Sequence, residues 1–328
     1  MEGAANPKPS TLRRGLVLAA KLALAAGLVI WLSRSGRLDF QKLTRVHLDG
    51  AMLGVIAGQL IVHFLPLLRW SLLLKAVDLK LTARQIAQIG LISYFAVLFL
   101  PATGGQEAVR LYYASRVERG RGHDVLATLV LDRVMGLVGL CVLALSSGLL
   151  LLIRTSARAV MDVMGFVAVL LVLFAGAMVF LLRAKPRRLG ALIERSPAIS
   201  ALSRSFEAFR GRRGVLFASL VLSCLGHFGS CMSMYFGFIA AGAPVPFVEV
   251  CAITPLVLLT SSIPVTPLGI GVADVAADRL FTLVGAVSGA EVTMLVRAVT
   301  ATAYLACGLA YLVPLPGSPP KAAEAGDR

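Results

Sequence analysis

Long apolar segments, each close to twenty residues or longer, alternate along this chain with shorter polar ones. They lie at about 15–33, 51–74, 124–153, 160–182, 215–242 and 292–313. An α-helix needs about 20 consecutive apolar residues to cross the roughly 30 Å hydrocarbon core of a bilayer. The pattern therefore predicts about six full membrane spans. We interpret the first segment as an uncleaved helix rather than a signal peptide, because many further spans follow it.

Two further apolar regions, residues 86–113 and 247–285, are interrupted near their centres. The interruptions are Pro101, Gly104 and Gly105 in the first region and Pro264, Gly269 and Gly271 in the second. Proline removes a backbone donor and glycine permits conformations that other residues avoid, so a straight helix is not expected there. Non-helical backbone at membrane depth is tolerated where protein or a water-filled cavity surrounds it. The sequence thus predicts an all-α, polytopic membrane bundle with two broken or re-entrant helical hairpins.

The distribution of Lys and Arg predicts the orientation of the chain. The loop 183–213 carries nine Lys or Arg residues against two Glu, which is typical of a cytoplasmic loop. Counting spans from this loop places both termini in the cytoplasm and makes the two hairpins enter from opposite faces of the inner membrane. Such an arrangement, with paired Gly/Pro breaks, indicates an inverted repeat of the kind that builds transporter sites. Residues 34–50 carry four basic residues on the predicted outer side, and we interpret them as an amphipathic surface piece.

The overall composition excludes several classes of protein. Of 328 residues, 58% are hydrophobic and 15% charged, whereas soluble domains are nearer half apolar and a quarter charged. A soluble enzyme, a disordered protein and a nucleic-acid-binding domain are therefore excluded. The net charge of +15 fits basic loops facing anionic lipid, and no nucleic-acid partner is predicted.

The same pattern predicts three parts of the chain. Residues 1–14 form a cytoplasmic segment, residues 15–313 a transmembrane domain, and residues 314–328 a disordered tail. Within the domain, halves of about 15–182 and 215–313 are joined by the basic loop 183–213. No soluble domain is expected.

Charged side chains inside the apolar segments are the candidates for chemistry, since each costs roughly 2.5–3.5 kcal/mol at the centre of a membrane helix. They are Glu107, Arg110, Asp132, Arg133, Asp274 and Arg297. We expect a polar cavity in which the three arginines bind an anionic headgroup, because guanidinium grips phosphate with two parallel bonds. The carboxylates would orient the arginines or carry protons. The alternative interpretation is that these residues are ion pairs that hold helices together, for example Glu107 with Arg133.

Other polar residues in the spans have ordinary explanations. Arg69 and Trp70 are interpreted as a snorkelling arginine with an interfacial tryptophan, and His63 and His227 as packing residues. The five cysteines show neither a CxxC pair nor a histidine at ligand spacing, so no disulfide framework or zinc site is predicted. Catalytic motifs such as Gly-x-Ser-x-Gly and His-Glu-x-x-His do not occur, and no cofactor is predicted.

Taken together, the motifs resemble those of the lysylphosphatidylglycerol synthase transmembrane region family, also called the flippase-like domain or UPF0104-type family. The resemblance covers roughly residues 15–313. It rests on Arg69-Trp70, Phe99-Leu100-Pro101 with Gly104-Gly105, Arg110, Leu131-Asp132-Arg133, and Ile263-Pro264-Val265-Thr266-Pro267 with Gly269-Ile270-Gly271.

This resemblance implies an α-helical membrane domain similar to a lipid flippase. In the full-length synthases a separate cytosolic domain transfers lysine from lysyl-tRNA, and that activity is not expected of this chain. Relatives are linked to translocation of charged phospholipids, polyprenyl-linked sugars or hopanoids. Two motifs depart from the family pattern: Gln106 replaces the usual Asp, with Glu107 next to it, and Asp274 replaces the usual Glu.

The sequence thus favours a flippase whose partners are membrane lipids. Its substrate would be an anionic phospholipid, or an intermediate linked to polyprenyl or to another lipid, which it moves between leaflets. Pro101, Gly104, Gly105, Pro264, Gly269 and Gly271 would shape the cavity. Two alternatives stay open. One is an intramembrane transferase acting on a lipid carrier, and the other is a non-catalytic subunit that anchors a membrane-associated glycosyltransferase or lipid synthase.

Overall fold

The computed structural model describes residues 30, 34, 48–100, 104–155, 158–183, 205–261 and 270–313. Within these ranges the ordered elements are helices, and no strand occurs among them. They are α3 (Gly50–Ala76), α4 (Ala83–Ala96), α5 (Gly105–Val117), α6 (Gly122–Thr155), α7 (Arg158–Arg183), α10 (Arg213–Ala240), α11 (Phe247–Ser261), α12 (Val272–Thr282), α13 (Gly289–Cys307) and the 3₁₀ helix η3 (Gly308–Leu312). The all-α fold class is confirmed.

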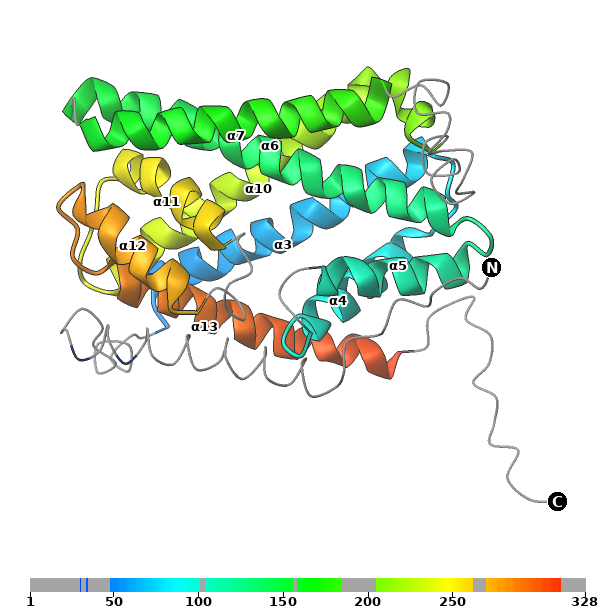
Figure 1. The fold of residues 1–328 in the computed structure, drawn as a ribbon. Coiled ribbons are helices and arrows are strands. Elements are labelled where there is room, and N and C mark those ends of the chain that lie inside the picture. Colours follow the sequence, from blue (N-terminus) through cyan, green and yellow to red (C-terminus); the bar gives the residue numbers. More distant parts are fainter. Residues whose placement is uncertain are drawn as a thin grey trace, which may run out of the picture.

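In the described part of the chain, five helices are long and apolar enough to cross a membrane. They are α3, α6, α7, α10 and α13 with its η3 extension. These helices coincide with five of the six predicted spans, and the remaining one, at 15–33, lies outside the described residues. Figure 1 shows the long helices running side by side along the long direction of the molecule.

Both predicted hairpins are broken helices. The first is α4 followed by α5, which begins directly after Gly104 with its φ of +77°. The second is α11 followed by α12, which begins after Gly271 with its φ of +82°. Positive φ costs glycine little because it has no Cβ, so the chain can change direction at these two positions. Pro101, Pro264 and Gly269 lie outside the described residues.

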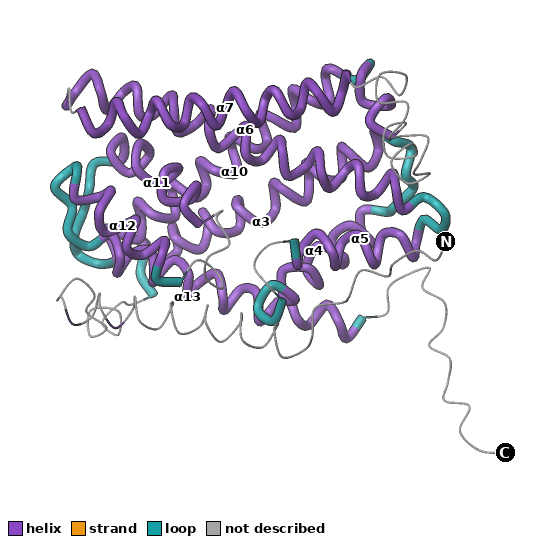
Figure 2. The backbone as a smooth tube through the Cα atoms, viewed as in Figure 1, coloured by secondary structure: helices purple, strands orange, loops and turns teal. Residues whose placement is uncertain are grey.

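The two hairpins lie at opposite ends of the bundle. In Figure 1, α4 and α5 lie at the end where α3 finishes, whereas α11 and α12 lie at the end where α3 begins. Figure 2 shows the connecting loops gathered mainly at these same two ends. This placement agrees with the predicted entry of the hairpins from opposite sides.

Small residues allow α3 and α10 to pack closely at the centre of the molecule. A Cβ atom on Gly58 would lie 2.7 Å from the carbonyl oxygen of Gly229. Side chains also bridge the two helices, because Gln59 Nε2 donates to Ser233 Oγ at 2.9 Å and that hydroxyl donates to the Val55 carbonyl at 3.1 Å. Close approach of backbones at small residues is the usual mode of packing between membrane helices.

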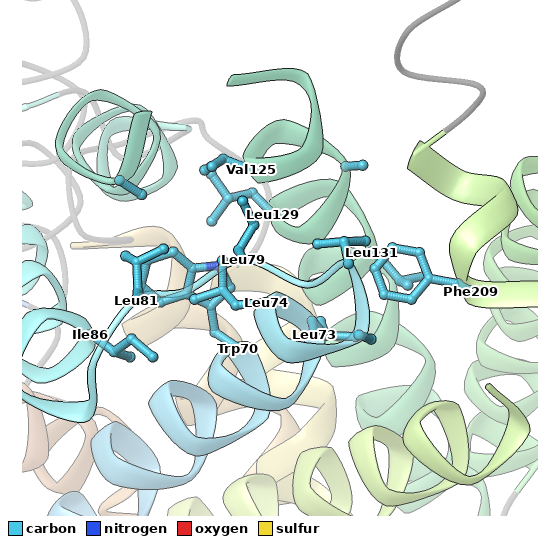
Figure 3. Packing of buried hydrophobic residues seen from close by; sticks show 14 of the residues in the cluster. Trp70, Leu73, Leu74, Leu79, Leu81, Ile86, Val125, Leu129, Leu131 and Phe209 are labelled. Carbon is cyan, nitrogen blue, oxygen red and sulfur yellow. The ribbon is translucent and has the colours of Figure 1, made fainter. Parts of the chain in front are cut away.

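A hydrophobic cluster closes the end of the bundle near α4 and α5. Figure 3 shows Trp70, near the end of α3, among leucines of α3, of α6 and of the segment that follows α3, with Phe209 beside Leu131. Trp70 is fully buried, and its indole Nε1 donates to Thr128 Oγ1 at 3.2 Å. This cluster fixes the α3–α6 contact on which the site described next is built.

Candidate functional site

A polar cavity of about 320 Å³ lies between α3, α6, α10 and the first hairpin. Four of the predicted site residues line it: Glu107, Arg110, Asp132 and Arg133. With Arg69 of α3, the lining holds three guanidinium groups against two carboxylates, an excess of one positive charge. Gln106, at the position where the family pattern has an acid, also lines the cavity.

Arg110 extends from α5 into the wall of this cavity and is only 3% exposed. Its Nε donates to Ser93 Oγ at 3.2 Å, and its Nη1 lies 3.8 Å from Asp132 Oδ2. The guanidinium also lies over the rings of Trp70 and Tyr94, at 5.3 and 5.7 Å from their centroids. The buried Nη2 has no hydrogen-bond partner among the described residues, so one strong donor remains available. Leaving such a donor unsatisfied is costly.

Asp132 is held by an arginine that the sequence analysis assigned to the membrane surface. Arg69 is 7% exposed, and its Nε donates to Asp132 Oδ1 at 2.6 Å, while its Nη1 donates to Ser223 Oγ at 2.6 Å. The snorkelling interpretation of Arg69 is therefore wrong, because the side chain turns inward to a buried carboxylate. The signals in the sequence were its charge inside an apolar segment and its place in the Arg69-Trp70 motif of the family resemblance.

Arg133 and Glu107 form a second, more accessible pair in the same cavity. Arg133 Nη1 lies 3.3 Å from Glu107 Oε1, and the two side chains are 50% and 30% exposed. The pair therefore joins α6 to α5 while leaving half of the Arg133 side chain uncovered. This contact matches the example of an ion pair that the sequence suggested.

The other two predicted residues lie beside a different cavity. Arg297 lines a neighbouring cavity of about 260 Å³ between α3, α10, α11 and α13. Its Nη1 lies 2.8 and 2.9 Å from the two carboxylate oxygens of Asp274. Asp274 is fully buried and also accepts from the Gly271 backbone N–H at 2.8 Å, which ties Arg297 to the break of the second hairpin. The predicted arginines are thus divided between two adjacent cavities rather than gathered in one.

Residues near the boundary of the two cavities were not predicted as site residues. Val62, His63 and Tyr304 line both cavities, and His227 lines the first, where it contacts the Gly136 carbonyl at 3.0 Å. No group of three His, Cys, Asp or Glu side chains that could hold a metal ion occurs in the described ranges. The chemistry that this arrangement offers is the binding of an anion by guanidinium groups.

The fold defines an α-helical membrane-domain architecture, and comparison with known proteins identifies its family. The model of the lysylphosphatidylglycerol synthase transmembrane region matches residues 18–308, and the chain belongs to that family. It is an integral membrane protein. The chain is also similar to a UPF0104 membrane protein of Pyrococcus horikoshii, with 22% identity over 259 residues covering 71% of this chain and 77% of the relative. No solved structure matches the chain.

Proposed function

We propose that this protein is a lipid flippase that moves an anionic phospholipid or lipid-linked intermediate between membrane leaflets. The observation that supports the proposal best is the buried Arg110 Nη2, which lines a polar cavity within the apolar bundle and lacks a partner among the described residues. A phosphate oxygen would satisfy this donor with a charge-assisted hydrogen bond. The family match is consistent with a lipid substrate, since lysylphosphatidylglycerol is itself a phospholipid.

In the proposed mechanism, two arginines act in succession. The half-exposed Arg133 contacts the headgroup first, and the buried Arg110 then binds it deeper in the cavity. Glu107 and Asp132 compete with the ligand for the guanidinium groups, which keeps binding weak enough for the headgroup to leave. The excess of one positive charge suits a headgroup with a single phosphodiester charge.

The test combines lipid binding with transport. Native mass spectrometry would identify lipids retained by the purified protein, and vesicles containing a fluorescent phosphatidylglycerol would report its movement between leaflets. We expect Arg133→Ala to abolish transport and to weaken lipid retention without loss of folding, because its pair with Glu107 is partly exposed and worth at most about 1 kcal/mol. Arg116→Ala, which removes an exposed arginine of α5, is the matched control and should behave as wild type.

Other outcomes would point elsewhere. Wild-type transport by a well-folded Arg133→Ala variant would refute the mechanism. A chemically altered lipid would favour the transferase alternative. A co-purifying synthase or glycosyltransferase, with no lipid retained and no effect of cavity variants, would favour the anchoring subunit.

A further inference from the structure

We propose that the cavity beside Arg297 is a second binding site for the same phosphate-bearing headgroup, so that two ligands can be held at once. This inference rests on the proposed function and adds a second site to it. Both cavities meet the same description: each is lined by an arginine and by a buried polar group without a hydrogen-bond partner among the described residues.

The unpartnered group of the second cavity is the Thr254 hydroxyl. Thr254 lies on α11, is 1% exposed, and lines the cavity together with Arg297 of α13. Its Oγ1 has no hydrogen-bond partner among the described residues, although a buried hydroxyl ordinarily finds one. Two side chains from different helices thus present donors to the same space.

Arg297 is held in a fixed position for this role. Its Nη1 contacts both oxygens of the buried Asp274, and the side chain is 18% exposed. An arginine has five N–H donors, so this contact leaves others for a ligand. Ser230 also lines the cavity, whereas the hydroxyls of Thr293 and Thr300 already donate to the Gly289 carbonyl and to Gln59 Oε1. Guanidinium and hydroxyl donors in a small cavity suit phosphate oxygens.

An aromatic wall separates the two cavities. The His63 ring meets the rings of Tyr94 and Tyr304 edge-on, with centroids 5.0 and 5.2 Å away, and the two tyrosines stack at 5.5 Å. Tyr94 Oη also donates to the His63 carbonyl at 2.6 Å. This wall keeps a headgroup in one cavity from contacting a headgroup in the other, and each cavity has its own arginine to neutralise a phosphate.

The wall lies beside a weak point in α3. Pro66 is inside this helix and lacks the N–H that would bond the Val62 carbonyl four residues earlier. Val62 and His63 both line the two cavities. A local bend at this position would shift the His63 ring without breaking further helical hydrogen bonds, and this gives a headgroup a way from one site to the other.

The experiment counts lipids bound to the intact protein. Native mass spectrometry would be recorded while phosphatidylglycerol is titrated, and again with the water-soluble headgroup glycerophosphoglycerol and with inorganic phosphate. We expect two phosphatidylglycerol molecules per wild-type chain. Thr254→Val, which keeps the shape of the side chain, should weaken one of the two binding steps about tenfold, as expected for a lost hydrogen bond to a charged group. Arg110→Gln should weaken the other.

Matched controls separate binding from folding. Thr260 lies on the same helix as Thr254, and its hydroxyl already donates to the Val257 carbonyl at 2.7 Å. The variant Thr260→Val should therefore leave both binding steps unchanged. Arg297→Lys keeps a charge beside Asp274 but loses the planar fork, and it should reproduce the effect of Thr254→Val.

The possible results are distinguishable. One bound lipid, lost in Arg110→Gln and unaffected by Thr254→Val, overturns this inference and leaves the proposed function in place. No bound lipid at either site overturns both. Binding of free phosphate, but not of the lipid, at the second site identifies it as a soluble-anion site and overturns the assignment to the headgroup.

Discussion

At the scale of single residues, the Arg69–Asp132 pair is the part of the first cavity that matters most for stability. Both side chains are at most 10% exposed, and the two atoms in contact lie 2.6 Å apart. Removing one partner of a buried ion pair leaves an uncompensated charge and costs about 3–5 kcal/mol. We expect Arg69→Ala to lower the thermal unfolding temperature in detergent well below that of Arg133→Ala.

The double variant Arg69→Ala/Asp132→Ala separates this charge effect from lost packing. It should recover only part of the stability, because the carboxylate that lost Arg69 is then gone but the buried Arg110 loses its contact with Asp132. If Arg69→Ala is as stable as Arg133→Ala, the pair is not what stabilises this region.

The sequence predicted which charged residues lie at a cavity better than it predicted where each side chain points. Four of the predicted residues meet in one cavity: Glu107, Arg110, Asp132 and Arg133. The first two follow a helix break and the last two lie inside an apolar helix, and both features are visible in the sequence. The direction of Arg69 could not be predicted. A helix that is apolar on nearly all sides gives no amphipathic pattern to show which face meets its neighbours.

At the scale of elements, α3 and α10 depend on small residues at their crossing. A methyl group on Gly58 would lie 2.7 Å from both the Gly229 carbonyl oxygen and the Ser233 backbone nitrogen. Since these are backbone atoms, the helices must move apart, and overpacking of this kind costs about 1–3 kcal/mol. We expect Gly58→Ala to lower the unfolding temperature in detergent.

Gly165→Ala in α7 is the matched control for this change. Among the described residues, no atom outside its own stretch of helix lies within 4 Å of a Cβ at that position. Because alanine favours helix over glycine, Gly165→Ala should be neutral or slightly stabilising. Equal stability of the two variants would show that the α3–α10 crossing tolerates extra volume.

The extent of the elements followed from the sequence with small errors. The predicted span at 51–74 is the helix Gly50–Ala76, and the span at 215–242 is the helix Arg213–Ala240. Apolar length and Gly/Pro breaks are local properties, so they can be predicted from one sequence. The division of the site into two cavities depends on how helices far apart in the chain pack, for example His63 against Tyr304, and no local pattern encodes that contact.

At the scale of the whole molecule, the positions of the hairpins lead to a prediction about membrane topology. The turn that connects α5 to α6 lies at one end of the bundle, and the turn between α12 and α13 lies at the other (Figure 1). If the long helices cross the bilayer, these two turns face opposite compartments. Arg119 and Val287 are exposed residues of these turns and suit cysteine substitution.

In a background without native cysteines, intact cells and inverted vesicles would be treated with a membrane-impermeant maleimide. We expect Val287→Cys to react in cells and Arg119→Cys to react only in inverted vesicles, because the basic loop 183–213 predicts that the Arg119 end is cytoplasmic. The reverse pattern would keep the opposite entry of the hairpins but invert the orientation. Labelling of both positions from the same face would contradict the inverted arrangement of the two hairpins.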